Sequence, residues 1–251
     1  MVKCKNCHHS VSGKFCSNCG QSAKVEDITL GTLVADLPHE IFHVDKGIFY
    51  NIIQLFKNPG TAIRDYFAGR RKPFYHPVSF IVIAFVVNYL VVKIINIHLY
   101  DQSELLTMKP AEAKAIKDYD AAQWWFLEHT YIYILLAIPA SALFLFCIFK
   151  LMKEKYNLAQ TAVVILFVIA QVVFIQTTIY LCFDWIKNGP FLRAVETVNM
   201  CMLIMYATYA IYRLFTPNKI KILRLIVSLI AATGLAFVWI ASSYLLYGLL
   251  G

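Results

Sequence analysis

Residues 77–98 read PVSFIVIAFVVNYLVVKIINIH, and this stretch decides the fold class. As a helix it is long enough to cross the roughly 30 Å hydrocarbon core of a bilayer, which takes about 20 apolar residues. Four later stretches have a similar length and apolar character, at about 131–151, 159–183, 195–215 and 220–248. The sequence therefore predicts an all-α polytopic membrane protein, with about five transmembrane helices in residues 77–251.

The overall composition supports lipid as the main solvent of this chain. Hydrophobic residues make up 59% of the sequence and charged residues only 15%, whereas soluble domains carry about 25% charged residues. The net charge of +8 sits beside the apolar stretches, where it suits contact with anionic lipid headgroups. We therefore expect membrane lipids as partners and no nucleic acid.

The distribution of basic residues predicts the orientation in the membrane. Lys and Arg number ten in residues 1–76, three in 150–158 and four in 213–224, which is 17 of the 23 in the chain. The alternate loops hold only three in 99–130 and two in 184–195. Since cytoplasmic loops carry the excess of basic residues, we predict an inner-membrane protein with a cytoplasmic N-terminus and a periplasmic C-terminus.

Residues 1–24 contain two Cys-x-x-Cys pairs, Cys4 with Cys7 and Cys16 with Cys19. Two such pairs supply the four thiolates of a closed tetrahedral zinc site. Competing interpretations are a redox dithiol, disulfides and an iron–sulfur cluster, but a cytosolic location disfavours stable disulfides and the paired spacing favours zinc. We predict a small zinc ribbon that holds one structural Zn²⁺ per chain.

A four-thiolate site leaves no open position for a reactive water. The ribbon is therefore expected to act as a docking surface, or as a clamp at the start of the membrane domain. Three other cysteines lie singly in apolar stretches and are interpreted as packing residues: Cys147, Cys182 and Cys201.

Residues 25–76 form a third region, between the ribbon and the first span. Apolar residues recur there at helical spacing: Ile41, Ile48, Ile52, Leu55 and Phe56. The tripeptide Asn58-Pro59-Gly60 interrupts the pattern, and a second short helix is expected to end near Gly69. We predict two amphipathic helices that lie at the membrane interface or pack under the bundle.

A basic cluster, Arg70, Arg71 and Lys72, ends this region just before the first span. Its simplest role is to anchor that span at the lipid phosphates. A sharper interpretation makes the cluster a specific site for a lipid headgroup or for a phosphate of a partner.

The pentapeptide His39-Glu40-Ile41-Phe42-His43 matches HExxH, the zinc-binding motif of many metalloproteases. On a helix it places two imidazoles on one face, with Glu40 able to activate a metal-bound water. Pro38 directly precedes the motif, Asp45 adds a charge, and no third ligand is evident. A membrane zinc protease with His39 and His43 as a second metal site is therefore the alternative hypothesis.

Polar residues within the first span give a weaker alternative, a transporter of lipids or small molecules. Asn88 and Lys93 are the first candidates for such a path. The competing interpretation is that Asn88 bonds to a neighbouring helix while Lys93 extends toward the outer surface.

Several short motifs in residues 4–80 resemble an uncharacterised family of small bacterial membrane proteins. The matching stretches are Cys4-x-x-Cys7, Phe15-Cys16-Ser-Asn-Cys19-Gly20-Gln21, Ile28-Thr29-Leu30, His43-Val44-Asp45-Lys46-Gly47, Asn58-Pro59-Gly60, Tyr66-Phe67-Ala68-Gly69-Arg70-Arg71 and Tyr75-x-Pro77. The resemblance implies an N-terminal zinc ribbon before a multi-span hydrophobic domain in the bacterial inner membrane. It implies a shared task for residues 43–77, with emphasis on His43 and Asp45, and no assigned activity.

Taken together, these patterns favour a non-enzymatic membrane factor. Its ribbon and interfacial helices are expected to bind a protein partner, or to assemble copies of the chain. No Walker loop, dinucleotide-binding fingerprint or nucleophile-elbow serine is present in the sequence.

Overall fold

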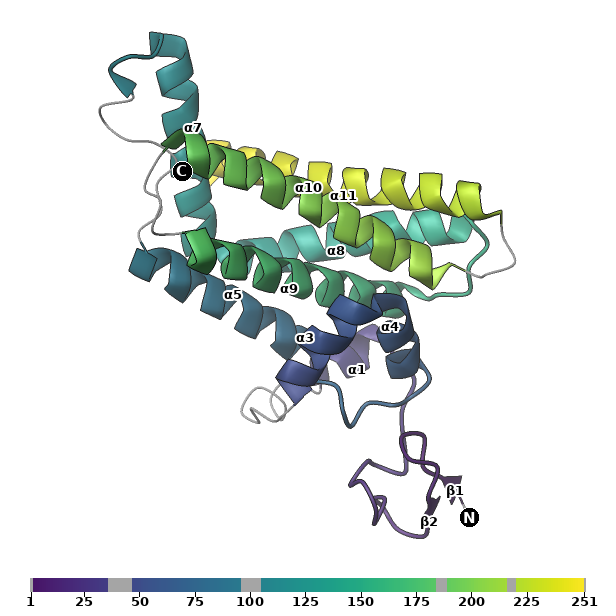
Figure 1. The fold of residues 1–251 in the computed structure, drawn as a ribbon. Coiled ribbons are helices and arrows are strands. Elements are labelled where there is room, and N and C mark those ends of the chain that lie inside the picture. The colour runs from purple at the N-terminus through teal and green to yellow at the C-terminus, as the bar shows by residue number, and fades with distance from the viewer. Residues whose placement is uncertain (1, 36–46, 96–104, 184–188, 216–219, 251) are drawn as a thin grey trace.

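The computed structural model describes residues 2–35, 47–95, 105–183, 189–215 and 220–250. Within these ranges, most of the chain beyond residue 29 is helical. Figure 1 shows a small module without helices at the N-terminus, next to an elongated bundle of helices. The prediction of a helical fold with a small N-terminal four-cysteine module is confirmed.

The N-terminal module has almost no core of its own. Strand β1 (Val2–Lys3) pairs antiparallel with β2 (Ser10–Val11) and forms a minimal hairpin. Within residues 2–24, three apolar side chains are buried: Cys4, Val11 and Cys16. Apolar burial on this scale is too small to hold a fold together, so its stability has to come from another source.

Three short helices connect this module to the bundle, namely α1 (Leu30–Ala35), α3 (Gly47–Lys57) and α4 (Pro59–Phe67). The predicted break at residues 58–60 is confirmed. Pro59 takes the first helical position of α4, where the missing proline N–H costs nothing because that position has no intrahelical acceptor.

The rest of the described chain consists of long helices. They are α5 (Pro77–Ile95), α7 (Pro110–Glu128), α8 (Thr130–Leu151), α9 (Leu158–Phe183), α10 (Gly189–Leu214) and α11 (Lys221–Leu250). All except α7 run side by side along the bundle, while α7 stands across one end of it (Figure 1).

Helix α9 is central to the packing and contacts α5, α8, α3 and α4. Its buried Phe167 meets the ring of Phe80 on α5 edge-on, with ring centroids 6.1 Å apart. The same ring meets Tyr66 of α4, with centroids 5.4 Å apart. Edge-to-face aromatic contacts add to the stability of a buried core, and here they join α4 to the same core as the long helices.

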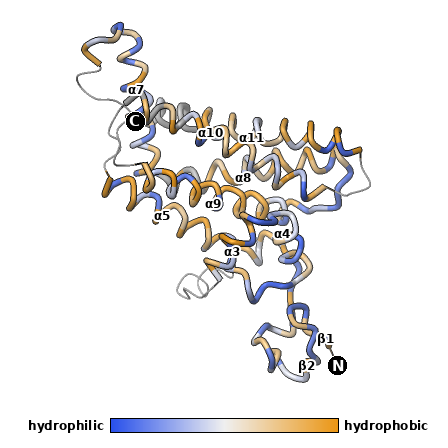
Figure 2. The backbone as a smooth tube through the Cα atoms, in the orientation of Figure 1, coloured by the Kyte–Doolittle hydropathy of each residue, from blue (hydrophilic) through white to orange (hydrophobic). Residues whose placement is uncertain are grey.

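The long helices consist mainly of hydrophobic residues, as the colours along the tube in Figure 2 show. Many of these side chains are exposed on the outside of the bundle. Ile94, Leu135 and Phe237 each expose more than two thirds of their surface. Three helical stretches are long and apolar enough to cross a membrane: Pro77–Ile95, Leu158–Phe183 and Lys221–Ala241. Because soluble proteins rarely expose apolar surface on this scale, the fold is that of a membrane protein.

The count of five spans stays a prediction. Helices α8 and α10 form over the second and fourth predicted spans. In the described part of the chain, however, the apolar stretch of α8 covers only Leu135–Leu151, and the sequence of α10 includes Arg193 and Glu196.

Helix α7 forms within the segment that the sequence assigned only to an outer loop. It is tied to α5 by an ion pair, because Lys93 Nζ lies 2.8 Å from Glu128 Oε1. The same ammonium lies 4.9 Å from the centre of the Trp124 ring, a cation–π distance. Lys93 therefore joins two helices at this end of the bundle.

Helix α4, one of the three short helices between the ribbon and the bundle, lies directly against α10 at Gly60. A Cβ atom added there would lie 2.7 Å from the carbonyl oxygen of Arg213 and 2.8 Å from its carbonyl carbon. Both are backbone atoms at the end of α10, which cannot move aside as a flexible side chain can. Only glycine allows α4 to approach α10 this closely.

We predict that Gly60→Ala lowers the midpoint of thermal unfolding in detergent by about 2–8 °C, because overpacking typically costs about 1–3 kcal/mol. The matched control is Gly248→Ala, where an added Cβ meets no atom within 4 Å. Equal midpoints for the two variants would contradict this contact between α4 and α10.

Candidate metal centre

The four cysteines of the N-terminal module converge on one point. Their sulfur atoms all lie within 4.8 Å of one another. The Cys4 and Cys19 sulfurs are 3.6 Å apart, and the Cys7 and Cys16 sulfurs are 3.5 Å apart. These separations are far longer than the roughly 2.05 Å of a disulfide bond, and all four thiols are free.

This donor set fits a tetrahedral metal ion. Four sulfurs at about 2.3 Å from a zinc ion define a tetrahedron with edges of about 3.8 Å, close to the distances seen here. In each of these two close pairs, one sulfur belongs to the first Cys-x-x-Cys loop and the other to the second. One ion bound to all four sulfurs would therefore join the two loops. The cluster can hold a metal ion, and a soft divalent cation suits its four thiolates best.

The two loops have the same backbone geometry. In the first, the N–H of His8 donates to the Cys4 carbonyl oxygen at 2.9 Å, and His8 has a φ of 60°. In the second, the N–H of Gly20 donates to the Cys16 carbonyl oxygen at 2.8 Å, with a φ of 74°. A left-handed residue directly after the second cysteine reverses the chain and turns both sulfurs to one side.

Each loop also stabilises a sulfur of the other loop. The side chain of Asn18 and the backbone N–H of His9 hydrogen-bond to Cys7 and lower the pKa of that thiol to about 6. The side chain of Asn6 and the backbone N–H of Gln21 likewise lower the pKa of Cys19. Donors around a thiolate favour the charged form that metals require.

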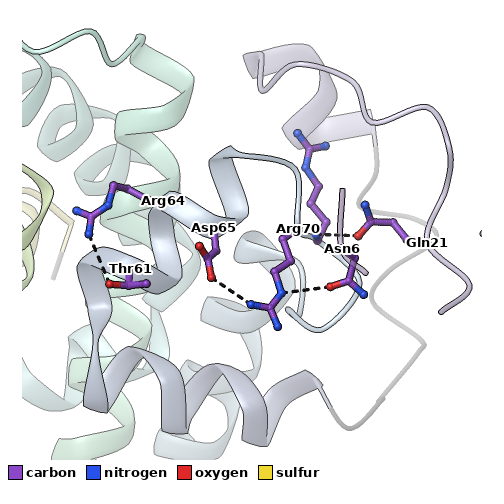
Figure 3. A network of polar contacts seen from close by, with 7 residues as sticks. Asn6, Gln21, Thr61, Arg64, Asp65 and Arg70 are labelled. Atoms are coloured by element: carbon purple, nitrogen blue, oxygen red, sulfur yellow. Dashed lines mark hydrogen bonds and ion pairs between the residues drawn. The ribbon is translucent and has the colours of Figure 1, made fainter. Parts of the chain in front are cut away.

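Gln21 fastens the ribbon to the turn that precedes α5 (Figure 3). Its Nε2 donates to the carbonyl oxygen of Gly69 at 2.9 Å, and its Oε1 accepts from the N–H groups of Arg71 and Lys72, both at 3.1 Å. The Gln21 side chain is buried, with 5% of its surface exposed. One amide therefore binds three backbone groups of the turn, of which the Arg71 N–H also donates to the Gly69 carbonyl oxygen at 3.1 Å.

A second contact links the metal centre to α4. Arg70 Nε donates to Asn6 Oδ1 at 3.2 Å, and Arg70 Nη1 forms an ion pair with Asp65 at 3.3 Å (Figure 3). Because Arg70 occupies the Asn6 oxygen, the amide NH₂ of Asn6 is left to face the Cys19 sulfur. Such outer partners fix the orientation of metal ligands.

The basic cluster of Arg70, Arg71 and Lys72 takes part in attaching the ribbon to the rest of the chain. Besides the Arg70 contacts, Arg71 Nη2 donates to the carbonyl oxygen of Glu26 at 2.6 Å. The guanidinium group of Arg71 also lies over the ring of Tyr66, with its carbon 5.5 Å from the ring centre. In the described part of the chain, only the ammonium of Lys72 among the three has no protein acceptor. A headgroup or phosphate site at Arg70, Arg71 and Lys72 stays a prediction, since both guanidinium groups already bind protein atoms.

The proposed second metal site lies outside the described residues. His39, Glu40 and His43 fall within 36–46, for which the structure gives no placement. Among the residues that it does describe, the four cysteines are the group of metal-ligating side chains that come together. The metalloprotease alternative therefore stays a hypothesis.

The two polar candidates of the first span have separate partners. Asn88 Nδ2 donates to Thr177 Oγ1 of α9 at 2.9 Å, and Lys93 pairs with Glu128 of α7. The contact of Asn88 is interhelical, as the packing interpretation expects for it. That interpretation expected Lys93 only to extend toward the outer surface, whereas Lys93 pairs with a second helix.

One comparison with known proteins bears on this region. The sequence model of a family described as a protein of unknown function, DUF3667, matches residues 45–88. The match covers α3, α4, the turn that Gln21 caps, and the first part of α5. It supports the resemblance to an uncharacterised family. No curated protein and no solved structure matches the chain.

Sequence reasoning missed the residues that attach the ribbon. Gln21 ends one of the stretches that resemble the uncharacterised family, but its role and those of Asn6 and Asp65 were not predicted, because Gln21 contacts a turn 48 residues away from it in the chain. The one local signal is the position of Gln21 directly after the second loop, next to a left-handed glycine.

We predict about one metal ion per chain by elemental analysis of the purified protein, and none in Cys16→Ser, because three thiolates and a hydroxyl no longer form the closed site. The control is Cys147→Ser, since this cysteine lies alone and exposed in α8. Equal metal content in all three proteins would contradict the cysteine site.

The double variant Glu40→Gln, His43→Ala extends the same measurement to the protease alternative. An unchanged metal content is expected if the cysteines hold the only tightly bound ion. A fall from two ions to one would instead establish a second site at His39 and His43.

Proposed function

We propose that this chain is a non-enzymatic factor of the bacterial inner membrane that binds a protein partner through its N-terminal ribbon and juxtamembrane helices. In this proposal the ribbon holds one structural Zn²⁺, and five spans run from a cytoplasmic N-terminus to a periplasmic C-terminus. The partner is a protein subunit or a second copy of the chain. The attachment of the ribbon to the turn at residues 69–72 carries the proposal.

The attachment supports a docking role because it holds the ribbon against α4 and the following turn, so that together they present one surface. A ribbon without a core would move freely on its linker. Here Gln21 and Asn6 hold it against α4 and the turn, and Tyr66 holds α4 against the bundle. A partner that binds the ribbon therefore binds a surface fixed to the membrane domain, with less ordering cost on binding.

Apolar side chains are exposed on this surface. Phe15 of the ribbon exposes 65% of its surface. Phe49, Ile53 and Phe56 form an exposed row along one side of α3, at helical spacing. Exposed aromatic residues are typical of protein or membrane contacts. We assign Phe15 to the protein partner because it lies on the polar ribbon.

The metal centre itself favours binding over catalysis. Four thiolates fill the coordination shell, so a substrate or a reactive water has no place on the ion. The ion would supply folding free energy to a module that buries only three apolar side chains.

We predict that a photo-crosslinking phenylalanine analogue at position 15 gives a discrete protein adduct in intact cells. The same analogue at Phe237, an exposed position on α11, is expected to label lipid and serves as the control. Combining the analogue at position 15 with Cys16→Ser should abolish the protein adduct, because the ribbon no longer folds. The absence of any protein adduct at position 15 would contradict the proposal.

A further inference from the structure

Arg224 is a buried cation in the first turn of α11. Only 7% of its surface is exposed, and it belongs to a stretch, Lys221–Ala241, that is long and apolar enough to cross a membrane. In the described part of the chain, no carboxylate forms an ion pair with it. A buried guanidinium group is costly unless an anion pairs with it, so Arg224 points to an anion from outside the protein.

Tyr212 of α10 holds the guanidinium group in place. The guanidinium carbon of Arg224 lies 4.8 Å from the centre of the Tyr212 ring, and Nη2 lies 3.4 Å from the Tyr212 hydroxyl oxygen. Nε is enclosed by the protein and has no acceptor, so it cannot receive a ligand. Nη1 also has no acceptor among the described residues, but it is not one of the enclosed atoms.

The N–H groups of Nη1 are therefore the accessible donors of this side chain. Stacking on the tyrosine ring fixes the plane of the guanidinium group and leaves these in-plane donors free. Arginine held in this way is suited to phosphate, because its donors match the oxygens of a phosphate group and its charge is permanent.

The position of Arg224 in the fold is that of a lipid headgroup. Helices α10 and α11 run next to each other (Figure 1). Helix α10 ends at Leu214 and α11 begins at Lys221, so Tyr212 and Arg224 both lie within one turn of a helix end. Beside Arg224, Ile222 and Leu225 expose 69% and 53% of their surfaces. A cation at the end of an exposed apolar surface matches the phosphate and acyl chains of a phospholipid.

The charge of this region favours an anionic headgroup over a zwitterionic one. Residues 213–224 contain four basic residues, and the sequence has no Asp or Glu after Glu196. Lys221 is exposed one turn before Arg224. Basic sites between membrane helices attract anionic lipid headgroups, and no acidic residue of α11 opposes that attraction here.

We propose that Arg224, stacked on Tyr212, binds the phosphate of an anionic phospholipid where α10 and α11 meet. Nη1 donates to the phosphate oxygens, Lys221 adds positive charge, and the acyl chains lie along the exposed apolar side chains of α11. The site uses none of the residues of the metal centre and does not depend on the proposed protein partner.

The probe is dioleoylphosphatidylglycerol, added to the full-length protein in detergent, with bound lipids counted by native mass spectrometry. The first molecule should bind more tightly than the first molecule of dioleoylphosphatidylcholine. Arg224→Gln should bind it about tenfold more weakly, because a charge-assisted contact is lost. The matched control is Lys57→Gln, which removes the same charge from an exposed position at the end of α3 and should bind the lipid normally.

Arg224→Lys keeps the charge and the long side chain, and it decides the question if Arg224→Gln does not fold. It should bind the lipid several-fold more weakly than the wild type, because an ammonium group lacks the planar fork of donors. Equal affinity of the wild type and the folded variants would overturn the proposal, as would equal binding of the two lipids. Inorganic phosphate that competes as well as the lipid would also overturn it, because the ligand would then be a free phosphate.

Discussion

The hydrogen bonds of one buried side chain, Gln21, join the N-terminal ribbon to the rest of the molecule. The amide caps three backbone groups of the turn between α4 and α5. Its position depends in turn on the loop around Cys16 and Cys19, where Gly20 reverses the chain. Because the ribbon buries so few apolar side chains, a metal ion bound by the four cysteines would supply much of the free energy that holds that loop in shape. The four-cysteine cluster and the attachment therefore share the same loop.

Helix α4, which precedes the turn, packs in its own right against the long helices of the membrane domain. Tyr66 of α4 reaches Phe167 in the middle of α9, and Gly60 lets the start of α4 lie directly against the end of α10. Tyr206 of α10 adds a hydrogen bond to the carbonyl oxygen of Leu55 at 3.1 Å. A partner that binds the ribbon would thus bind a surface connected to α9 and α10.

Local signals in the sequence predicted the local features correctly. The spacing of the cysteines indicated their cluster, and Pro59 indicated where α3 gives way to α4, because each depends on only a few neighbouring residues. Helix α7 was missed because its sequence mixes charged and apolar residues without a clear period. The contacts of Gln21 depend on a distant part of the chain, and no pattern within one segment indicates them.

The most direct test is hydrogen–deuterium exchange of the backbone amides of Arg71 and Lys72, which donate to Gln21. Peptides that cover residues 68–76 would be compared in the metal-loaded protein and after a chelator has removed the metal. We expect slow exchange with metal and markedly faster exchange without it, while peptides from the core of α9 stay unchanged. Equal exchange of this turn in the two states would show that the metal centre does not hold the ribbon on the membrane domain.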